Sequence, residues 1–289
     1  MNHVKNFIEL IRLKKPIGYM LLFWPCVWGL VIGYDFSNNI KLFIKFAILF
    51  LCGAILMRSA GCIINDIIDK DFDSKVERTK DRPIASGKVS IELGLIYALI
   101  LCGLAFIVLI QFNFLTITLA LLSMPLAFSY PLMKRFTYWP QLFLGITFNY
   151  GLILGWTATN GEISIISLIF YFGAIFWTLG YDTIYGFQDI KDDEIIGVKS
   201  TSIKFKQNPK LFISLCYFIF FISLTFIGLK MTLNSIFYIG LLIVFLHLFF
   251  FQIIFLKVES AQNCLKIFKS NNFLGMIVFV SLIIGKIIL

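Results

Sequence analysis

The sequence predicts an all-α polytopic membrane protein, built as a single domain over residues 1–289. Hydrophobic residues make up 59% of the chain and charged residues only 14%, whereas about 25% are charged in soluble domains. The mean hydropathy is +0.90. Apolar runs of about 20 residues, enough to cross a hydrocarbon core about 30 Å thick, recur from end to end. Because these runs are continuous rather than alternating, we expect helices instead of barrel strands.

Nine spans are predicted in one bundle. The main rival count merges the third and fourth, which are separated by "QFN", into one long kinked segment. The predicted ranges are 17–34, 42–66, 91–110, 113–131, 139–158, 164–188, 210–229, 233–255 and 272–289.

The positive charges predict the orientation. Of the 25 Lys and Arg residues, 20 lie in the N-terminal segment and in the loops after spans two, four, six and eight. Lysine and arginine mark the cytoplasmic side of a membrane protein, so the N-terminus is expected to be cytoplasmic. The net charge of +9 therefore reflects topology, and it does not indicate a nucleic-acid partner. The six cysteines are scattered without metal-ligand spacing.

The acidic residues gather in two segments at the same membrane surface. "NDIIDKDFD" (residues 65–73) ends the second span, and "GYDTIYGFQDIKDDE" (residues 180–194) ends the sixth. Helical spacing places residues three, four and seven apart on one face. The stripes predicted in this way are Asn65, Asp66, Asp69 and Asp73 on one helix and Asp182, Tyr185, Asp189 and Asp193 on the other.

Two such stripes require a compensating cation, because neighbouring carboxylates repel one another and are costly to remove from water. Carboxylate oxygens are hard ligands, which makes Mg²⁺ the expected metal. Magnesium takes one or two carboxylates and completes its octahedron with water and phosphate oxygens. The sequence therefore predicts a polyphosphate substrate held between the ends of the second and sixth spans. A solvated acidic loop is the plainer alternative.

Basic residues complete this predicted site. Arg78 and Arg82 follow the first acidic segment, and Lys134 and Arg135 follow Tyr130 after the fourth span. Arginine binds phosphate oxygens in a bidentate manner and lysine adds a point charge. Arg58 lies inside the second span on the face of Asn65, and an ionisable residue there is a functional candidate. We expect it to face the carboxylate of a small aromatic acid, with pairing to an acid from another helix as the alternative.

The segments "RSAGCIINDIIDKDFDSKVERTKDRPIASGKVS" and "GYDTIYGFQDIKDDEIIGVKSTS" resemble the two signature regions of the UbiA-type membrane prenyltransferases. The first matches the NDxxDxxxD pattern and the second the DxxxD region. "RSAGC", "GYDTIYGFQD" and "GVKSTS" are most similar to members that act in ubiquinone biosynthesis. The resemblance covers nearly the whole chain and implies transfer of a polyprenyl group from an all-trans polyprenyl diphosphate to the 3-position of 4-hydroxybenzoate.

The resemblance also implies roles for individual residues. Those implied for Mg²⁺ are Asp66, Asp69, Asp73, Asp189 and Asp193. Diphosphate binding is implied for Arg78, Arg82, Lys134 and Tyr130, and acceptor binding for Arg58, Asn65, Arg135 and Asn149. Asp182 is the candidate for orienting the phenol or accepting a proton. Gly145, Gly151 and Gly155 either leave room for the prenyl tail or allow close helix packing.

Three questions stay open at this point. The acceptor is alternatively a naphthoate, homogentisate or haem. A cation-coupled transporter is the rival class, opposed by acids that gather at one surface rather than at the midplane. Because no transit-like extension precedes the first span, we expect the inner (plasma) membrane of a bacterium rather than a mitochondrial inner membrane.

Overall fold

The structure is a computed structural model that describes residues 2–287, and all the regular structure in this range is helical. Eight of its helices are long and apolar enough to cross a membrane. The long elements are α2 (Ile17–Gly33), α3 (Ile40–Ile68), α5 (Ile91–Leu109), α6 (Phe114–Ser129), α8 (Pro140–Asn160), α9 (Ile165–Gly186), α12 (Pro209–Lys230), α13 (Ser235–Phe245) with the π-helix η2 (Leu246–Ile254), and α14 (Ala261–Ile287).

The predicted ranges fall on these helices within two residues at every end but those of the last one. At 17 residues, α2 is shorter than each of the eight candidate spans when contiguous helices such as Phe114–Phe136 are joined, so the count of nine crossings stays a prediction. The third and fourth predicted spans are separate helices, because the chain turns between Leu109 and Phe114. Asn113 caps the second of these helices by accepting a hydrogen bond from Thr116 N at 2.9 Å.

The start predicted for the last span, residue 272, is wrong. The helix α14 begins at Ala261 and takes in the polar stretch before that point, and residues 288–289 lie outside the described range. Asn271 accepts a hydrogen bond from the Trp177 indole at 2.8 Å, and Asn272 accepts one from the Trp24 indole at 2.9 Å. Polar residues remain in a packed membrane helix when such partners satisfy them.

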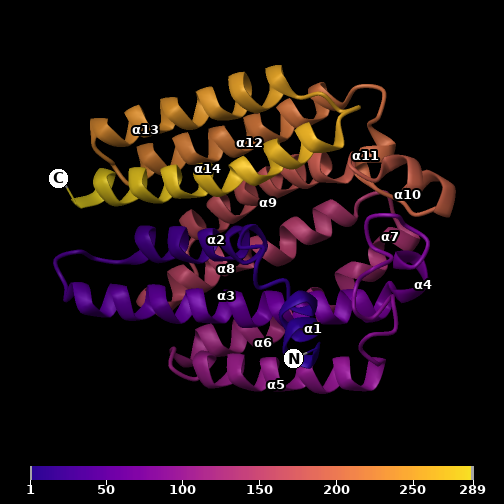
Figure 1. Cartoon of the computed structure of the whole chain (residues 1–289). Coiled ribbons are helices and arrows are strands. Elements are labelled where there is room, and N and C mark those ends of the chain that lie inside the picture. Colours follow the sequence, from indigo (N-terminus) through magenta and orange to yellow (C-terminus); the bar gives the residue numbers. More distant parts are fainter. Residues whose placement is uncertain (1, 288–289) are drawn as a thin grey trace.

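The long helices are arranged in three layers (Figure 1). The helices α12, α13 and α14 form one layer, α2, α8 and α9 the middle one, and α3, α5 and α6 the third. The middle layer is tightly packed: a Cβ atom at Gly155 would overlap the Cys26 carbonyl oxygen of α2, and one at Gly145 would lie 2.8 Å from the Ile175 oxygen of α9. These two glycines therefore serve close helix packing rather than a tail cavity.

Short helices gather at one end of the bundle, where the predicted site lies (Figure 1). They lie in the loops that follow α3, α6 and α9, and they carry many of the charged residues of those loops. Their bounds are α4 (Lys70–Asp73), η1 (Tyr130–Leu132), α7 (Met133–Phe136), α10 (Ile190–Ile196) and α11 (Thr201–Lys204). The N-terminal helix α1 (Asn2–Leu10) contacts α3.

Candidate active site

The first acidic segment is divided between two helices. The helix α3 ends at Ile68 and α4 begins at Lys70, with Asp69 (φ −97°, ψ 4°) between them. The main chain bends here without losing its hydrogen bonds, since Asp69 N donates to Asn65 O at 2.9 Å and Asp73 N donates to Asp69 O at 2.8 Å. The expectation of one continuous helical stripe is therefore wrong, although Asp66, Asp69 and Asp73 are all buried.

The second acidic segment repeats this design. The helix α9 ends at Gly186 and α10 begins at Ile190, and Asp189 stands at the N-cap of α10 without capping it. Asp182 lies inside α9, and Asp193 lies within α10. As in the first segment, the predicted single stripe is broken by a bend. The bend frees the Asp189 side chain from its helix, so that it points to a partner from another loop.

Arg82 joins two carboxylates of the first segment. Its Nη1 lies 2.6 Å from Asp73 Oδ2 and 3.2 Å from Asp66 Oδ1. The Lys134 ammonium, from α7, lies 2.6 Å from Asp69 Oδ2. Both basic residues were expected to bind a diphosphate, and both are placed within reach of the carboxylates. Because these ion pairs are largely withdrawn from water, each carboxylate has a strong electrostatic partner.

Arg78 joins the first loop to the second acidic segment. Its Nε donates to Asp189 Oδ1 at 2.7 Å, and its Nη1 donates to the Tyr185 hydroxyl at 3.2 Å. The guanidinium also lies 5.6 Å from the centre of the Tyr185 ring, within the range of a cation–π contact. The two acidic segments, far apart in sequence, are thus held together by a single arginine.

The carboxylates of residues 2–287 do not form a ready metal cluster: no group of three Asp, Glu, His or Cys side chains is placed to hold one ion. Basic side chains separate the carboxylates instead, because like charges repel. Two observations nevertheless fit a hard divalent cation. Asp69 Oδ1 is buried without a hydrogen-bond partner, and Asp193 makes no ion pair within the described part of the chain.

The environment of these two carboxylates also matters for proton binding. Burial, and then the neighbouring Asp189, raise the pKa of Asp193 to about 6. Burial raises the pKa of Asp69, and the Lys134 ammonium partly offsets this. A raised carboxylate pKa means that the nearby positive charge does not fully offset the cost of burying the ionised form. Both groups therefore gain from a cation placed beside them.

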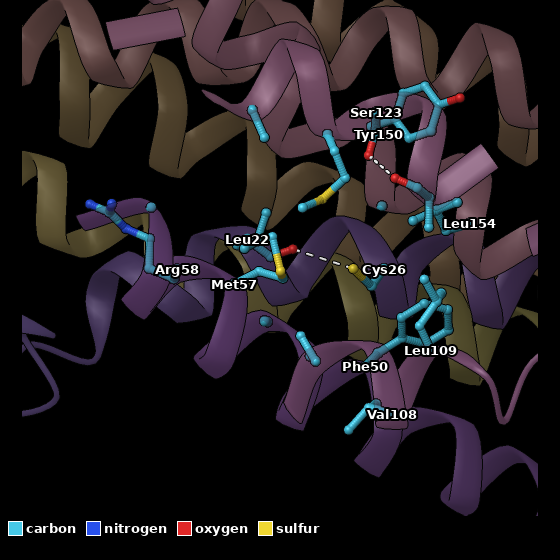
Figure 2. A pocket seen from close by; sticks show the side chains of 18 of the residues that line it. Leu22, Cys26, Phe50, Met57, Arg58, Val108, Leu109, Ser123, Tyr150 and Leu154 are labelled. Carbon is cyan, nitrogen blue, oxygen red and sulfur yellow. Dashed lines mark hydrogen bonds between the residues drawn. The ribbon is translucent and has the colours of Figure 1, made fainter. Parts of the chain in front are cut away.

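An apolar cavity of about 240 Å³ leads away from the charged end. Its walls come from α2, α3, α5, α6 and α8, and Arg58 and Tyr130 are among its few polar lining residues. Figure 2 shows Arg58 at one end of the lining, with Phe50 and Leu109 at the other. Phe106 and Leu121 line the cavity and are also exposed on the lipid-facing surface. The cavity therefore reaches the side of the bundle between α5 and α6.

Arg58 has an unusual position at this junction. Its Nε is buried and makes no hydrogen bond to any described residue, while its guanidinium lies 5.7 Å from the Phe148 ring centre. Asp182 of α9 interacts with Arg58 electrostatically. Asn65 is half-buried, two turns along the same face. Tyr130 lies beside Arg58 on the cavity wall, although we expected it at the diphosphate.

Two residues expected at the acceptor lie elsewhere. The Arg135 Nη2 donates to the Ile68 carbonyl at 2.7 Å and its guanidinium lies over the Phe72 ring, so Arg135 closes the end of α3. Asn149 is fully buried between α8 and α9, where its amide nitrogen donates to Gly145 O and to Thr178 Oγ1. Neither residue lines the cavity.

The sequence analysis missed one residue of this site. Arg12, between α1 and α2, forms an ion pair with Asp66, and its Nη1 lies 3.5 Å from Cys62 Sγ. It stands among other N-terminal basic residues that the positive-inside rule explains. The sequence did offer one signal, the apolar pair Leu10 and Ile11 directly before Arg12. Both residues are buried and hold this segment against the bundle.

A family model confirms the class of protein that this fold and site suggest. The model of the UbiA prenyltransferase family matches residues 22–278. The chain therefore belongs to the UbiA prenyltransferase family, and it is a multi-pass membrane protein.

Curated relatives extend this result over nearly the whole chain. A protein of Arabidopsis thaliana named mitochondrial 4-hydroxybenzoate polyprenyltransferase is 43% identical over 98% of this chain and 69% of its own length. The Drosophila melanogaster protein of that name is 40% identical over 98% of this chain and 72% of its own length. A 4-hydroxybenzoate octaprenyltransferase of Psychromonas ingrahamii is 39% identical over 96% of both chains.

Solved structures share the fold. A UbiA homologue from Aeropyrum pernix superposes with a TM-score of 0.74 at 23% identity, over 94% of this chain and 97% of that one. A homologue from Archaeoglobus fulgidus, described as bound to GPP and Mg²⁺, gives a TM-score of 0.72 at 17% identity, over 96% and 99%. These likenesses establish the arrangement of helices.

Proposed function

We propose that the chain transfers a polyprenyl group from an all-trans polyprenyl diphosphate to the 3-position of 4-hydroxybenzoate and releases diphosphate, as a step of ubiquinone biosynthesis. One observation carries the proposal: an apolar cavity begins at Arg58, about two turns along α3 from the first aspartate of the charged site, and the buried Arg58 Nε has no hydrogen-bond partner among the described residues. The relatives at about 40% identity, which are named for this reaction, support the choice of acceptor.

The diphosphate group lies between the two acidic segments in this proposal. Arg78, Arg82 and Lys134 come from separate loops, and each is already placed at a carboxylate of the site. The aspartates that would hold Mg²⁺ are Asp66, Asp69, Asp73, Asp189 and Asp193. Bound there, Mg²⁺ supplies charge neutralisation for the leaving diphosphate. The basic side chains stabilise the same developing charge by hydrogen bonds, which favours breaking of the allylic C–O bond.

The allylic cation that results needs a dry site with aromatic faces. Tyr185 faces the charged end and packs against Phe268, with ring centres 4.5 Å apart. Phe148 lies at the start of the cavity, beneath the Arg58 guanidinium. Aromatic faces attract cations, and the apolar cavity walls exclude the water that would otherwise capture the cation. The prenyl tail then extends along the cavity toward the side of the bundle.

The acceptor is held by Arg58. Its buried Nε lacks a partner, and a carboxylate would satisfy it with a charge-assisted hydrogen bond. Asn65 is placed two turns along α3 toward the aspartates, where it suits a polar group of the acceptor. Asp182 is our candidate for orienting the phenol or accepting a proton, because it interacts electrostatically with Arg58 from α9. The ring carbon ortho to the hydroxyl then faces the allylic carbon, forms the new bond to it and loses its own proton, which restores the aromatic ring.

The whole chain acts as one domain in this proposal, with the short helices and the N-terminus on the cytoplasmic side. The distribution of Lys and Arg supports this orientation. The membrane is the inner (plasma) membrane of a bacterium or the inner membrane of mitochondria, since relatives from Psychromonas ingrahamii and from eukaryotes match at 39% and 43% identity.

The test uses the full chain in lipid nanodiscs with Mg²⁺, a long all-trans prenyl diphosphate and radiolabelled 4-hydroxybenzoate. Labelled lipid is the expected product, and it disappears with EDTA. Product from a naphthoate, homogentisate or haem acceptor but not from 4-hydroxybenzoate would retain the reaction and replace the acceptor. No diphosphate release with any acceptor would overturn the proposal.

A further inference from the structure

We propose that Arg12 is an additional diphosphate-binding residue. Its guanidinium is paired with Asp66 until a divalent cation binds that carboxylate and releases it. The inference deepens the proposed function, on which it rests, because it adds a third guanidinium to the same site. It starts from the ion pair between Arg12 and Asp66, which joins the N-terminal segment to the first aspartate of the acidic segment.

The backbone of Arg12 is in a conformation that favours glycine. Arg12 has φ +53° and lies two residues beyond the end of α1. Two hydrogen bonds define the turn: Leu13 N donates to Ile8 O at 3.3 Å, and Arg12 N donates to Glu9 O at 3.1 Å. This is the Schellman pattern of a helix end, in which glycine is the usual residue at the left-handed position. An arginine at this place is therefore costly for the fold, and it requires a compensating contact.

The turn is fixed rigidly to the bundle. Leu10 is fully buried and Ile11 is 8% exposed, and both belong to a cluster with Ile63 of α3 and Ile84 of the following loop. The Phe7 ring packs edge-on against Tyr97 of α5 at 4.8 Å. These contacts hold the backbone of the turn in place, so the Arg12 side chain can change its partner without moving the segment.

Two arginine side chains contact the single carboxylate of Asp66, so positive charge exceeds negative charge there. Asp66 forms ion pairs with both Arg12 and Arg82, but Arg82 also forms an ion pair with Asp73. Asp66 is the only carboxylate in ion-pair contact with Arg12 in the described part of the chain. When a divalent cation takes Asp66, Arg82 keeps a partner and Arg12 loses its own. The released guanidinium, with Tyr130 and Tyr185 among its electrostatic neighbours, then lies within the site where phosphate oxygens would arrive.

The inference predicts opposite changes in two binding constants. The probes are Mn²⁺, followed by electron paramagnetic resonance, and inorganic pyrophosphate, both titrated into the full chain in nanodiscs. In Arg12→Gly, Mn²⁺ should bind several-fold more tightly in the absence of any phosphate, because no guanidinium competes for Asp66. Pyrophosphate, added at saturating Mn²⁺, should bind about tenfold more weakly, because one charged hydrogen-bond donor is lost.

Glycine suits φ +53°, so Arg12→Gly should fold, and its melting temperature reports whether it does. Lys14→Gly is the matched control: Lys14 is exposed, two residues further along, and forms no ion pair with any described residue, so both constants should stay unchanged. Arg12→Lys should restore part of the pyrophosphate affinity. The proposal is overturned if both affinities fall together in Arg12→Gly, as expected of a merely structural residue, or if neither changes. Neither titration uses an acceptor, so this result is independent of the transfer reaction.

Discussion

Asp69 and Asp189 occupy equivalent places in the two halves of the site. Each follows the end of a membrane helix, precedes a short helix as its N-cap residue, and makes no capping hydrogen bond with its side chain. Each carboxylate is instead paired with a basic side chain from a different loop, Lys134 or Arg78. The bends therefore direct both carboxylates inward, where a regular helix would keep them in line with their neighbours.

The first prediction concerns Asp69, whose buried Oδ1 has no partner. Asp69→Asn should lower the rate of diphosphate release about 100-fold or more at saturating substrates, because one charged ligand at the leaving group is removed. Asp71→Asn is the matched control, since Asp71 belongs to the same segment but is exposed. Equal rates of diphosphate release for the two variants would show that Asp69 takes no part in this step.

The second prediction is a pH dependence centred on Asp193, whose pKa is raised to about 6 by burial and then by Asp189. The carboxylate must be ionised to bind Mg²⁺, so the affinity for Mg²⁺ should be full above pH 6 and fall as the pH drops through 6. In Asp193→Asn this inflection should vanish. The measurement is the half-saturating Mg²⁺ concentration between pH 5 and 8.

Stability should change in the opposite sense for the same group. The folded pKa of Asp193 lies above the value of about 3.9 for an unfolded aspartate. Protonation therefore stabilises the folded state below about pH 4, and this contribution is lost as the pH rises through about 6. Thermal unfolding of the metal-free chain, compared with Asp193→Asn, measures it. A variant with the same pH profile as the parent would show that Asp193 is not the titrating group.

The third prediction concerns Gly53, which lines the cavity from α3 with open space where a Cβ would lie. Because a Cβ atom at Gly53 would meet nothing within 4 Å, Gly53→Phe should direct its ring into the cavity and fill part of it. It should lower kcat/KM for a long prenyl diphosphate about tenfold relative to a short one. Gly103→Phe, on the exposed face of α5 with equally open surroundings, should leave this ratio unchanged. A ratio that moves in neither variant would place the tail elsewhere.

The fourth prediction separates the two arginines assigned to the acceptor. Arg58→Met should raise KM for 4-hydroxybenzoate about tenfold or more, because a charged hydrogen bond of about 1.5–3 kcal/mol is lost, and should leave KM for the prenyl diphosphate nearly unchanged. Arg135→Met should instead lower the melting temperature, because Arg135 holds the end of α3. Initial rates at varied concentrations of each substrate distinguish these results. The reverse pattern would move the acceptor to Arg135.

The fifth prediction tests the opposite end of the bundle. The Lys286 ammonium donates to the carbonyls of Ile32 at 2.7 Å and Tyr34 at 2.6 Å, and so closes the end of α2 from α14. Lys286→Met should lower the free energy of unfolding by about 2 kcal/mol, since these buried carbonyls lose their partner. Lys230→Met, an exposed lysine at the end of α12, is the control. Thermal unfolding in detergent measures both, and equal melting temperatures would contradict the role of Lys286.

Hydropathy predicted most of the helices because a membrane span is a local property of the sequence. It missed the start of α14, where Asn271 is satisfied by Trp177 from a distant helix. Spacing identified the aspartates but not the bends: the break at Asp69 has no Gly or Pro beside it, and Gly186 before Asp189 is one of several glycines in the long helices. Arg12 was missed for a similar reason: its role depends on a turn and on a contact 54 residues away.

The cavity ends at a lipid-facing opening near Phe106 and Leu121, while the charged end lies among the polar loops. In the proposed reaction the two products therefore separate by solubility: diphosphate returns to water, and the prenylated ring is already surrounded by hydrocarbon. The reverse reaction would require diphosphate from water and the prenylated product from the bilayer to bind the site together. Inhibition by product should accordingly come from added diphosphate, competing with the prenyl diphosphate, far more than from the lipid.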